Sequence, residues 1–252
     1  MHTAAVIPVR MGSTRYPGKP LCNIQGMSMV EHVWRRTVPA SNVDATYIAT
    51  PDEEIRKAAE SFGAEVIMTG EHDRATDRVA EAARSFDADV VVVMQGDEPL
   101  IHPEMIERAV QPVIDGGARV TNLAKPILQQ EQYADPNNVK VVVDTDSDAL
   151  YFSRAPIPNL HTGSYEETMV LQQVCVIPFE RSLLFEFAGM EQTPLERAES
   201  IDMLRLLENG FGVTIIETDR QTFPVDTPAD HERVDSIMQD DAYFQRYGDA
   251  RS

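Results

Sequence analysis

Four consecutive valines near position 90 constrain the fold more than any other stretch of this sequence. Residues 89–94 read Asp-Val-Val-Val-Val-Met and show no alternation of polar and apolar side chains. A strand of this kind must be covered on both faces, which is typical of a parallel sheet packed between helices. The run ends in Gln-Gly-Asp-Glu-Pro at 95–99, which predicts a loop at the carboxyl end of the strand.

Strand-like and helix-like patterns alternate over the first 114 residues. Short apolar runs at 4–9, 47–50 and 65–68 precede the valine strand. Helical patterns with acidic first turns or regular apolar spacing separate and follow them, at 28–38, 51–62, 76–86 and 104–114. This alternation predicts an α/β fold with a doubly wound, mostly parallel, Rossmann-like sheet and right-handed crossovers.

The pattern changes after Gly117. Strands are expected without regular helices between them, which indicates a small antiparallel excursion, 118–180, that could serve dimerisation, within a single domain spanning 1–252. A helix is expected from the Thr-Pro-Leu-Glu start at 193 to about residue 208, and a last long helix after the Asp-Thr-Pro at 226–228. The expected strands in this half are 120–124, 139–143, 150–153, 171–177 and 213–217.

The loop after the first strand is the best candidate for an anion site. It carries Arg10, Arg15 and Lys19 among glycines and prolines, and no acidic residue precedes Glu31. Glycine has no side chain, so its backbone can approach phosphate oxygens closely, and the three cations neutralise the negative charge of the phosphate. The spacing is neither that of a Walker A loop nor G-x-G-x-x-G. The alternative is an ordinary basic surface loop.

The overall charge excludes several classes of partner. The chain has 22 Lys and Arg against 41 Asp and Glu, a formal charge of −19. Such a protein is not expected to bind nucleic acid or an anionic membrane. The two cysteines form no disulfide framework, no signal-like segment is evident, and no apolar run reaches about 18 residues. We therefore expect a cytoplasmic protein.

Several acidic residues could bind a metal ion. Asp97 follows the valine strand, where ligand groups lie in open α/β sheets, and beside a phosphate loop it would suit Mg²⁺. A turn role is the alternative for Asp97, and helix capping is the alternative for Asp226. The acidic stretch 144–148 lacks EF-hand spacing; it reads as a polar hairpin turn rather than the D-x-D site of a sugar-transferring enzyme.

Seven short motifs occur in one order along nearly the whole chain: Ile7-Pro8-Val9-Arg10, Ser13-Thr14-Arg15, Pro17-Gly18-Lys19-Pro20-Leu21, Gln95-Gly96-Asp97-Glu98-Pro99, Leu150-Tyr151-Phe152-Ser153-Arg154-Ala155, Thr193-Pro194-Leu195-Glu196 and Val225-Asp226-Thr227-Pro228. Taken together, these motifs resemble those of 3-deoxy-manno-octulosonate (Kdo) cytidylyltransferases, also called CMP-Kdo synthetases. The resemblance implies a nucleotidyltransferase fold, a homodimer, Mg²⁺, and transfer of CMP from CTP to an acid sugar with release of pyrophosphate.

The resemblance also implies roles for individual residues. Lys19, Arg10 and Asp97 are the expected catalytic residues, and Asp97 and Asp226 the expected metal ligands. The expected nucleotide-binding residues are Pro8, Arg10, Ser13, Arg15, Lys19, Ala49, Thr50, Arg78 and Gln95. The expected acceptor-binding residues are Gln95, Arg154, Gln173, Glu199 and Asp202.

The chain departs from the family pattern in the acceptor half. Where the family has a His and two Tyr, this sequence has Gln173, Ile177 and Phe179, and Met203 replaces a Gln. A site that loses hydroxyl-binding groups discriminates against its former substrate, so these changes predict poor use of Kdo itself. They leave open another small anionic acceptor, such as a phosphonate or carboxylate. A non-catalytic nucleotide-binding protein and a glycosyltransferase are alternatives of other kinds.

Overall fold

The computed structural model describes residues 1–13, 15–161 and 170–248, and the chain forms two compact units. The first comprises Met1–Glu107 and Thr222–Ser252, and the second comprises Arg108–Gln221. The boundary therefore falls inside one helix, α4 (Pro103–Ile114). The expected antiparallel excursion at 118–180 lies within the second unit.

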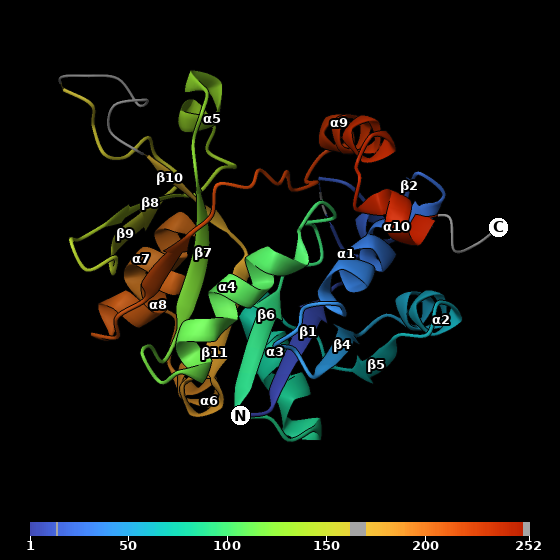
Figure 1. The fold of residues 1–252 in the computed structure, drawn as a ribbon. Helices are drawn as coiled ribbons and strands as arrows, with labels where there is room; N and C mark the ends of the chain where they lie inside the picture. Colours follow the sequence, from blue (N-terminus) through green and yellow to red (C-terminus); the bar gives the residue numbers. More distant parts are fainter. Residues whose placement is uncertain (14, 162–169, 249–252) are drawn as a thin grey trace. The chain divides into compact units, whose positions relative to one another are not determined.

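A parallel sheet forms the centre of the first unit, with strands in the order β6-β1-β4-β5 (Figure 1). Val91, Val92 and Val93 of β6 are fully buried, as the valine run predicts. The elements of this unit are β1 (Thr3–Pro8), η1 (Lys19–Leu21), β2 (Asn23–Ile24), β3 (Met27–Ser28), α1 (Met29–Thr37), β4 (Ala45–Thr50), α2 (Glu53–Ser61), β5 (Glu65–Met68), α3 (Ala75–Ala82), η2 (Ala83–Ser85), β6 (Val90–Met94), α9 (Pro228–Gln239) and α10 (Phe244–Gly248).

The second unit contains a largely antiparallel sheet in the order β12-β7-β10-β8-β9, in which only β12 and β7 run parallel. The predicted fold class, a mostly parallel sheet with an antiparallel part, is confirmed. The elements of this unit are β7 (Thr121–Pro126), α5 (Gln130–Ala134), β8 (Lys140–Val143), β9 (Ala149–Ser153), β10 (Leu171–Val174), β11 (Val176–Glu180), α6 (Arg181–Gly189), α7 (Pro194–Glu199), α8 (Met203–Glu208) and β12 (Thr214–Glu217).

The acidic stretch 144–148 is the polar turn between β8 and β9. The backbone N–H groups of Asp146 and Asp148 both donate to Asp144 Oδ1 at 2.9 Å, and Asp144 N–H donates to the Asp148 carbonyl. These contacts are those of an Asx-type turn. The hairpin interpretation is therefore confirmed.

Two expected elements are each divided in the structure. The strand expected at 171–177 is two strands, β10 and β11, that meet at Cys175. The prediction of one helix from 193 to 208 is also wrong, because α7 ends at Glu199 and the next residue, Ser200, has φ of 57°. This left-handed turn lets α8 fold back, so that Arg205 donates from Nη2 to buried Glu196 at 2.7 Å. This buried ion pair joins α7 and α8 across the turn.

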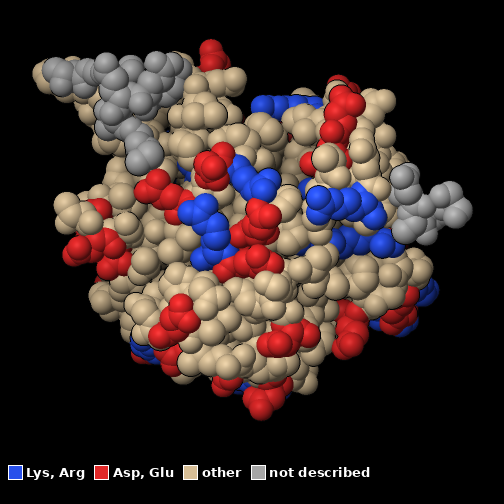
Figure 2. Space-filling model, in the orientation of Figure 1, with Lys and Arg blue, Asp and Glu red and all other residues tan. Residues whose placement is uncertain are grey.

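Acidic side chains are spread across the face drawn in Figure 2 rather than gathered in one patch, in keeping with the formal charge of −19. Among the residues that the structure describes, no helix is both long and apolar enough to cross a membrane.

A buried histidine joins α1 to the C-terminal helix α10 in the first unit. His32 has no exposed surface; its Nε2 lies 2.8 Å from the Ile24 carbonyl and its Nδ1 lies 2.8 Å from the Tyr247 hydroxyl. Burial lowers the pKa of His32 to about 4, and the nearby charge of Arg36 adds to this effect. The imidazole is therefore neutral in the folded protein at neutral pH.

This neutral histidine should make folding stability depend on pH. Between pH 6.5 and about 4 the unfolded chain binds a proton at His32 that the folded protein does not, so the free energy of unfolding falls as pH falls through this window. From pH 7 to pH 5 the wild-type protein should lose about 2 kcal/mol more than a His32→Gln variant in urea unfolding. An exposed-site control, His161→Gln, should retain the wild-type pH dependence; equal losses in wild type and His32→Gln would contradict the prediction.

Candidate active site

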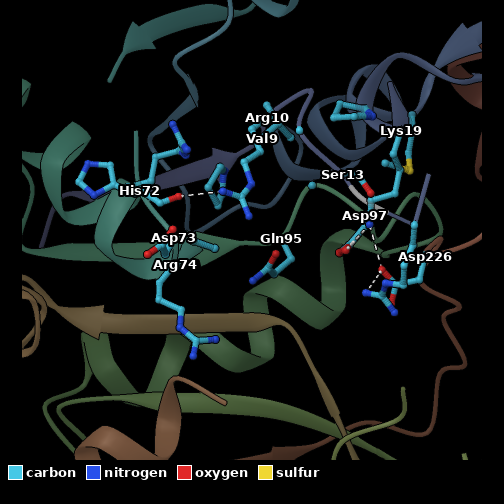
Figure 3. A pocket seen from close by; sticks show the side chains of 18 residues that line it. Val9, Arg10, Ser13, Lys19, His72, Asp73, Arg74, Gln95, Asp97 and Asp226 are labelled. Carbon is cyan, nitrogen blue, oxygen red and sulfur yellow. Dashed lines mark hydrogen bonds and ion pairs between the residues drawn. The ribbon is translucent and has the colours of Figure 1, made fainter. Parts of the chain in front are cut away.

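A cavity of about 310 Å³ lies at the carboxyl ends of β1 and β6 in the first unit (Figure 3). The carboxyl ends of neighbouring parallel strands meet at one edge of a sheet, where α/β proteins bind ligands. The loops that follow both strands therefore reach the same cavity, together with the start of α3. The lining residues are Pro8, Val9, Arg10, Gly12, Ser13, Arg15, Lys19, Pro20, Met29, His72, Asp73, Arg74, Ala75, Arg78, Gln95, Gly96, Asp97 and Asp226.

Lys19 joins the two carboxylates that were predicted to bind metal. Its Nζ donates to Asp97 Oδ2 at 2.9 Å and to Asp226 Oδ1 at 3.1 Å, and Arg15 Nη2 donates to the same Asp226 oxygen at 2.9 Å. Figure 3 shows these contacts as dashed lines on one side of the cavity. Three segments far apart in the sequence thus supply two acids and two bases to one place.

This cluster is partly shielded from water. The side chains of Lys19, Asp97 and Asp226 are 13, 24 and 21% exposed. Burial acts to lower the pKa of Lys19, but the two carboxylates outweigh it, so the pKa lies above its usual value. Lys19 is therefore firmly charged at neutral pH, as a group that binds phosphate must be.

The donor set suits a hard divalent cation that a ligand helps to hold. Asp97 and Asp226 already converge on one positive charge, the Lys19 ammonium. Among the described residues, no group of three or more His, Cys, Asp or Glu side chains could hold a metal ion by itself. Mg²⁺ commonly uses one or two carboxylates and takes its other ligands from phosphates and water. The two aspartates fit that pattern.

Gly96 allows the loops after β1 and β6 to approach each other. A Cβ atom at this position would lie 2.3 Å from Val9 Cγ1 and 3.3 Å from the Pro8 carbonyl oxygen. Any larger residue would push the Gln95–Asp97 backbone away from the first loop. The close approach of the two loops therefore requires glycine at the middle position of the Gln-Gly-Asp motif.

The other side of the cavity is formed around Arg10 and Arg78. Arg10 Nη1 donates to the His72 carbonyl at 3.1 Å. Arg78 is 2% exposed and donates from Nη1 to Thr69 Oγ1 at 2.7 Å, while its Nη2 has no hydrogen-bond partner among the described residues. Burial lowers the pKa of the Arg78 guanidinium, an effect that Glu71 opposes. Gln95 lies between this side and the Lys19 cluster in Figure 3.

Ala49 and Thr50 do not line this cavity, although the resemblance implies that they contact the nucleotide. Both are fully buried, and their carbonyls support the adjoining loops. Ala49 accepts from Val9 N–H at 3.0 Å, and Thr50 accepts from Thr69 N–H at 3.0 Å. Thr14, part of the Ser13-Thr14-Arg15 motif, lies outside the described residues.

The expected acceptor-binding residues other than Gln95 belong to the second unit. Arg154 and Glu199 are joined there: Arg154 N–H donates to Glu199 Oε2 at 2.9 Å, and Arg154 Nε donates to the Glu199 carbonyl at 2.7 Å. Gln173 Nε2 donates to Asn122 Oδ1. Asp202 directly precedes α8, and its carbonyl accepts from Arg205 N–H at 3.0 Å.

The apolar substitutions in the acceptor half are packed into the interior. Ile177, Phe179 and Met203 are 4, 0 and 0% exposed, and the Phe179 ring contacts that of Phe187. At these positions an apolar side chain contributes to the core, which is sufficient reason for its presence. Their apolar character alone therefore does not identify an acceptor.

Some cavity residues were not identified from the sequence. His72, Asp73 and Arg74 line it from the loop before α3, and Asp52 Oδ2 accepts from Met11 N–H at 2.8 Å, which ties the first loop to the start of α2. The sequence places His72 in a loop without metal-ligand spacing, which predicts a surface or hydrogen-bonding role, and in the structure His72 contacts Glu81. One signal in the sequence could have identified these residues: they lie a few positions before Arg78, which is itself an expected nucleotide-binding residue.

Comparisons with known proteins point to one family. The model of a cytidylyltransferase family matches residues 4–219. The chain is 42% identical to a 3-deoxy-manno-octulosonate cytidylyltransferase of Syntrophotalea carbinolica over 94% of this chain and 99% of the relative, and 43% identical to one of Geobacter metallireducens over 93 and 96%. It is similar to the solved structure of a CMP:2-keto-3-deoxy-manno-octonic acid synthetase complexed with CTP, with a TM-score of 0.88 and 37% identity over 95% of this chain and 99% of that one.

Proposed function

Because the chain belongs to the 3-deoxy-manno-octulosonate cytidylyltransferase family, we propose that it transfers CMP from CTP to Kdo and releases pyrophosphate. The observation that carries this proposal is the convergence of three cations of the first loop with two carboxylates at one cavity. This arrangement suits a polyanionic triphosphate in a protein whose overall charge would otherwise repel it.

In the reaction, the acceptor oxygen attacks the α-phosphorus of CTP as the bond to pyrophosphate breaks. Arg10, Arg15 and Lys19 hold the phosphates and stabilise charge that develops on them. Little covalent work falls to the protein in such transfers, so no nucleophilic side chain is needed.

Asp97 and Asp226 are the residues that would hold the metal. Cytidylyltransferases generally use a divalent metal ion, and we infer that it is Mg²⁺ here, since the donors are two carboxylates beside a phosphate site. When bound, Mg²⁺ supplies positive charge that neutralises the phosphate oxygens.

The acceptor can be tested directly. With CTP and Mg²⁺, addition of Kdo should raise the rate of pyrophosphate release at least tenfold above that with CTP alone, and mass spectrometry should detect CMP-Kdo. Small carboxylates and phosphonates, assayed alongside, should give no such increase.

The alternative acceptor that the sequence left open is a small phosphonate or carboxylate, but the apolar residues at 177, 179 and 203 are buried in the interior and give it no support. The names of the relatives favour Kdo over the sequence-based prediction that Kdo is poorly used. Turnover with a smaller anion but not with Kdo would show that the smaller anion, rather than Kdo, is the acceptor. If CTP binds but none of the tested acceptors stimulates pyrophosphate release, the acceptor is a different compound. If CTP does not bind, the protein is not a CTP-dependent cytidylyltransferase.

Two further expectations accompany the proposed function. We infer a homodimer, which light scattering should detect as a mass close to twice the 28.1 kDa of the chain. We also infer a cytoplasmic location, which fractionation of the source cells would test.

A further inference from the structure

A short loop between β5 and α3 contributes part of the cavity wall. This loop, residues 69–73, begins where Thr69 N–H donates to the Thr50 carbonyl, and its His72 and Asp73 line the cavity (Figure 3). Residues 69–73 belong to no helix or strand, and beyond the bond at Thr69 the loop is held by side chains of α3.

Two residues of α3 hold this loop. The Glu81 carboxylate accepts from Gly70 N–H at 3.1 Å with each oxygen, and it also contacts His72 Nε2. Arg78 Nη1 donates to Thr69 Oγ1 at 2.7 Å and to the Gly70 carbonyl at 3.1 Å. Residues three apart lie on the same side of a helix, which is why both reach the loop.

The contact with His72 favours the charged form of Glu81. The hydrogen bond with His72 lowers the pKa of the Glu81 carboxyl and outweighs the opposing effect of burial, and the bond from Gly70 N–H adds a smaller effect in the same direction as His72. A charged carboxylate is the stronger acceptor for both partners. Glu81 is therefore suited to hold the backbone at Gly70 and the side chain at His72 together.

The loop in turn contacts a cation of the proposed phosphate site. Arg10 Nη1 donates to the His72 carbonyl at 3.1 Å. Arg10 follows β1, and its long side chain could adopt many rotamers. A partner that limits its orientation before a phosphate binds therefore reduces the conformational entropy lost on binding. Glu81, His72 and Arg10 thus form a chain of contacts from α3 to the cavity.

We propose that Glu81 is a positioning residue for CTP: it holds the 69–73 loop so that the His72 carbonyl orients the Arg10 guanidinium toward the triphosphate. This inference rests on the proposed function, because it presumes that the cavity binds CTP. Glu81 itself does not line the cavity and acts only through the loop.

A double-mutant cycle tests this role. Calorimetry would give the Kd of CTP with Mg²⁺ for wild type, Glu81→Ala, Arg10→Ala and the double variant. Glu81→Ala should weaken binding about tenfold in the wild-type background, the scale of one charge-assisted contact. In the Arg10→Ala background the same change should weaken it less than about twofold, because the residue through which Glu81 acts is absent.

Two further variants separate positioning from a merely structural role. Glu81→Gln retains an acceptor for Gly70 N–H, so it should recover most of the affinity lost in Glu81→Ala. Glu60→Ala removes an acid from exposed α2 of the same unit and should leave CTP binding unchanged.

The outcomes are distinct. Equal losses in both Arg10 backgrounds, or no loss on Glu81→Ala in the wild-type background, would overturn the positioning role while leaving the proposed function intact. Failure of the wild-type protein to bind CTP would overturn the proposed function and this inference with it. Loss of affinity in Glu81→Ala that Glu81→Gln restores, together with a small loss in the Arg10→Ala background, would support it.

Discussion

Replacing Asp97 or Asp226 by asparagine should lower kcat/KM for CTP by about 10³-fold or more, because each change removes a carboxylate from the proposed metal site. Several kcal/mol of transition-state stabilisation depend on charge at such a site, and each 1.36 kcal/mol is a factor of ten. Asparagine preserves the size of the side chain, so circular dichroism and thermal unfolding should show an intact fold. Pyrophosphate release under saturating Mg²⁺ measures the effect.

The control for this prediction is Asp240→Asn, which removes an exposed carboxylate at the end of α9, the helix that Asp226 precedes. This variant should retain wild-type turnover. Titration of Mg²⁺ in the presence of CTP should show weakened metal binding in Asp97→Asn and Asp226→Asn alone. Near-normal pyrophosphate release by either variant would reject that residue as a metal ligand.

Replacing Lys19 by alanine should weaken CTP binding and lower kcat/KM by about 10²-fold, the usual scale for one electrostatic contact at a reacting group. Two causes act together. The variant loses a cation whose charged form the two partly buried carboxylates favour, and it leaves Asp97 and Asp226 without the ammonium that now lies between them. Steady-state kinetics with CTP as the varied substrate would separate the effect on KM from that on kcat.

Lys57→Ala provides the matched comparison. Lys57 lies on α2 of the same unit, its side chain is 70% exposed, and its nearest acidic partner is 3.9 Å away. Its loss changes the net charge by the same amount as the loss of Lys19, but it should leave the kinetics almost unchanged. Similar effects from both variants would mean that overall charge, rather than the first loop, governs CTP binding.

Local patterns in the sequence were sufficient for most helices and strands. The expected strand 65–68 has the bounds of β5, and the valine run is buried as predicted. The last long helix, α9, begins at the Asp-Thr-Pro signal, where Thr227 N–H donates to Asp230 Oδ2 at 2.8 Å. Capping and periodicity succeed because they depend on residues within one helical turn or a few strand positions.

The candidate site could be predicted in part for a topological reason. The loops after β1 and β6 carry Arg10, Lys19 and Asp97, and adjacent parallel strands bring their carboxyl ends to one edge. Asp226 has no such signal, since its local sequence is that of a helix start. The resemblance to a family supplied it, and the structure places it in contact with Lys19.

The α/β alternation, the basic first loop in an acidic chain and the family to which the motifs belong can all be predicted from the order of residues alone. The folded structure was needed to show that Lys19 bridges carboxylates 78 and 207 residues away, that Ala49 and Thr50 support loops, and that Glu81 holds the loop beside Arg10. It also decided the break at Ser200. Each of these features depends on residues more than one helical turn apart, and their partners are chosen by packing and charge pairing in the folded protein, which short-range propensity does not contain.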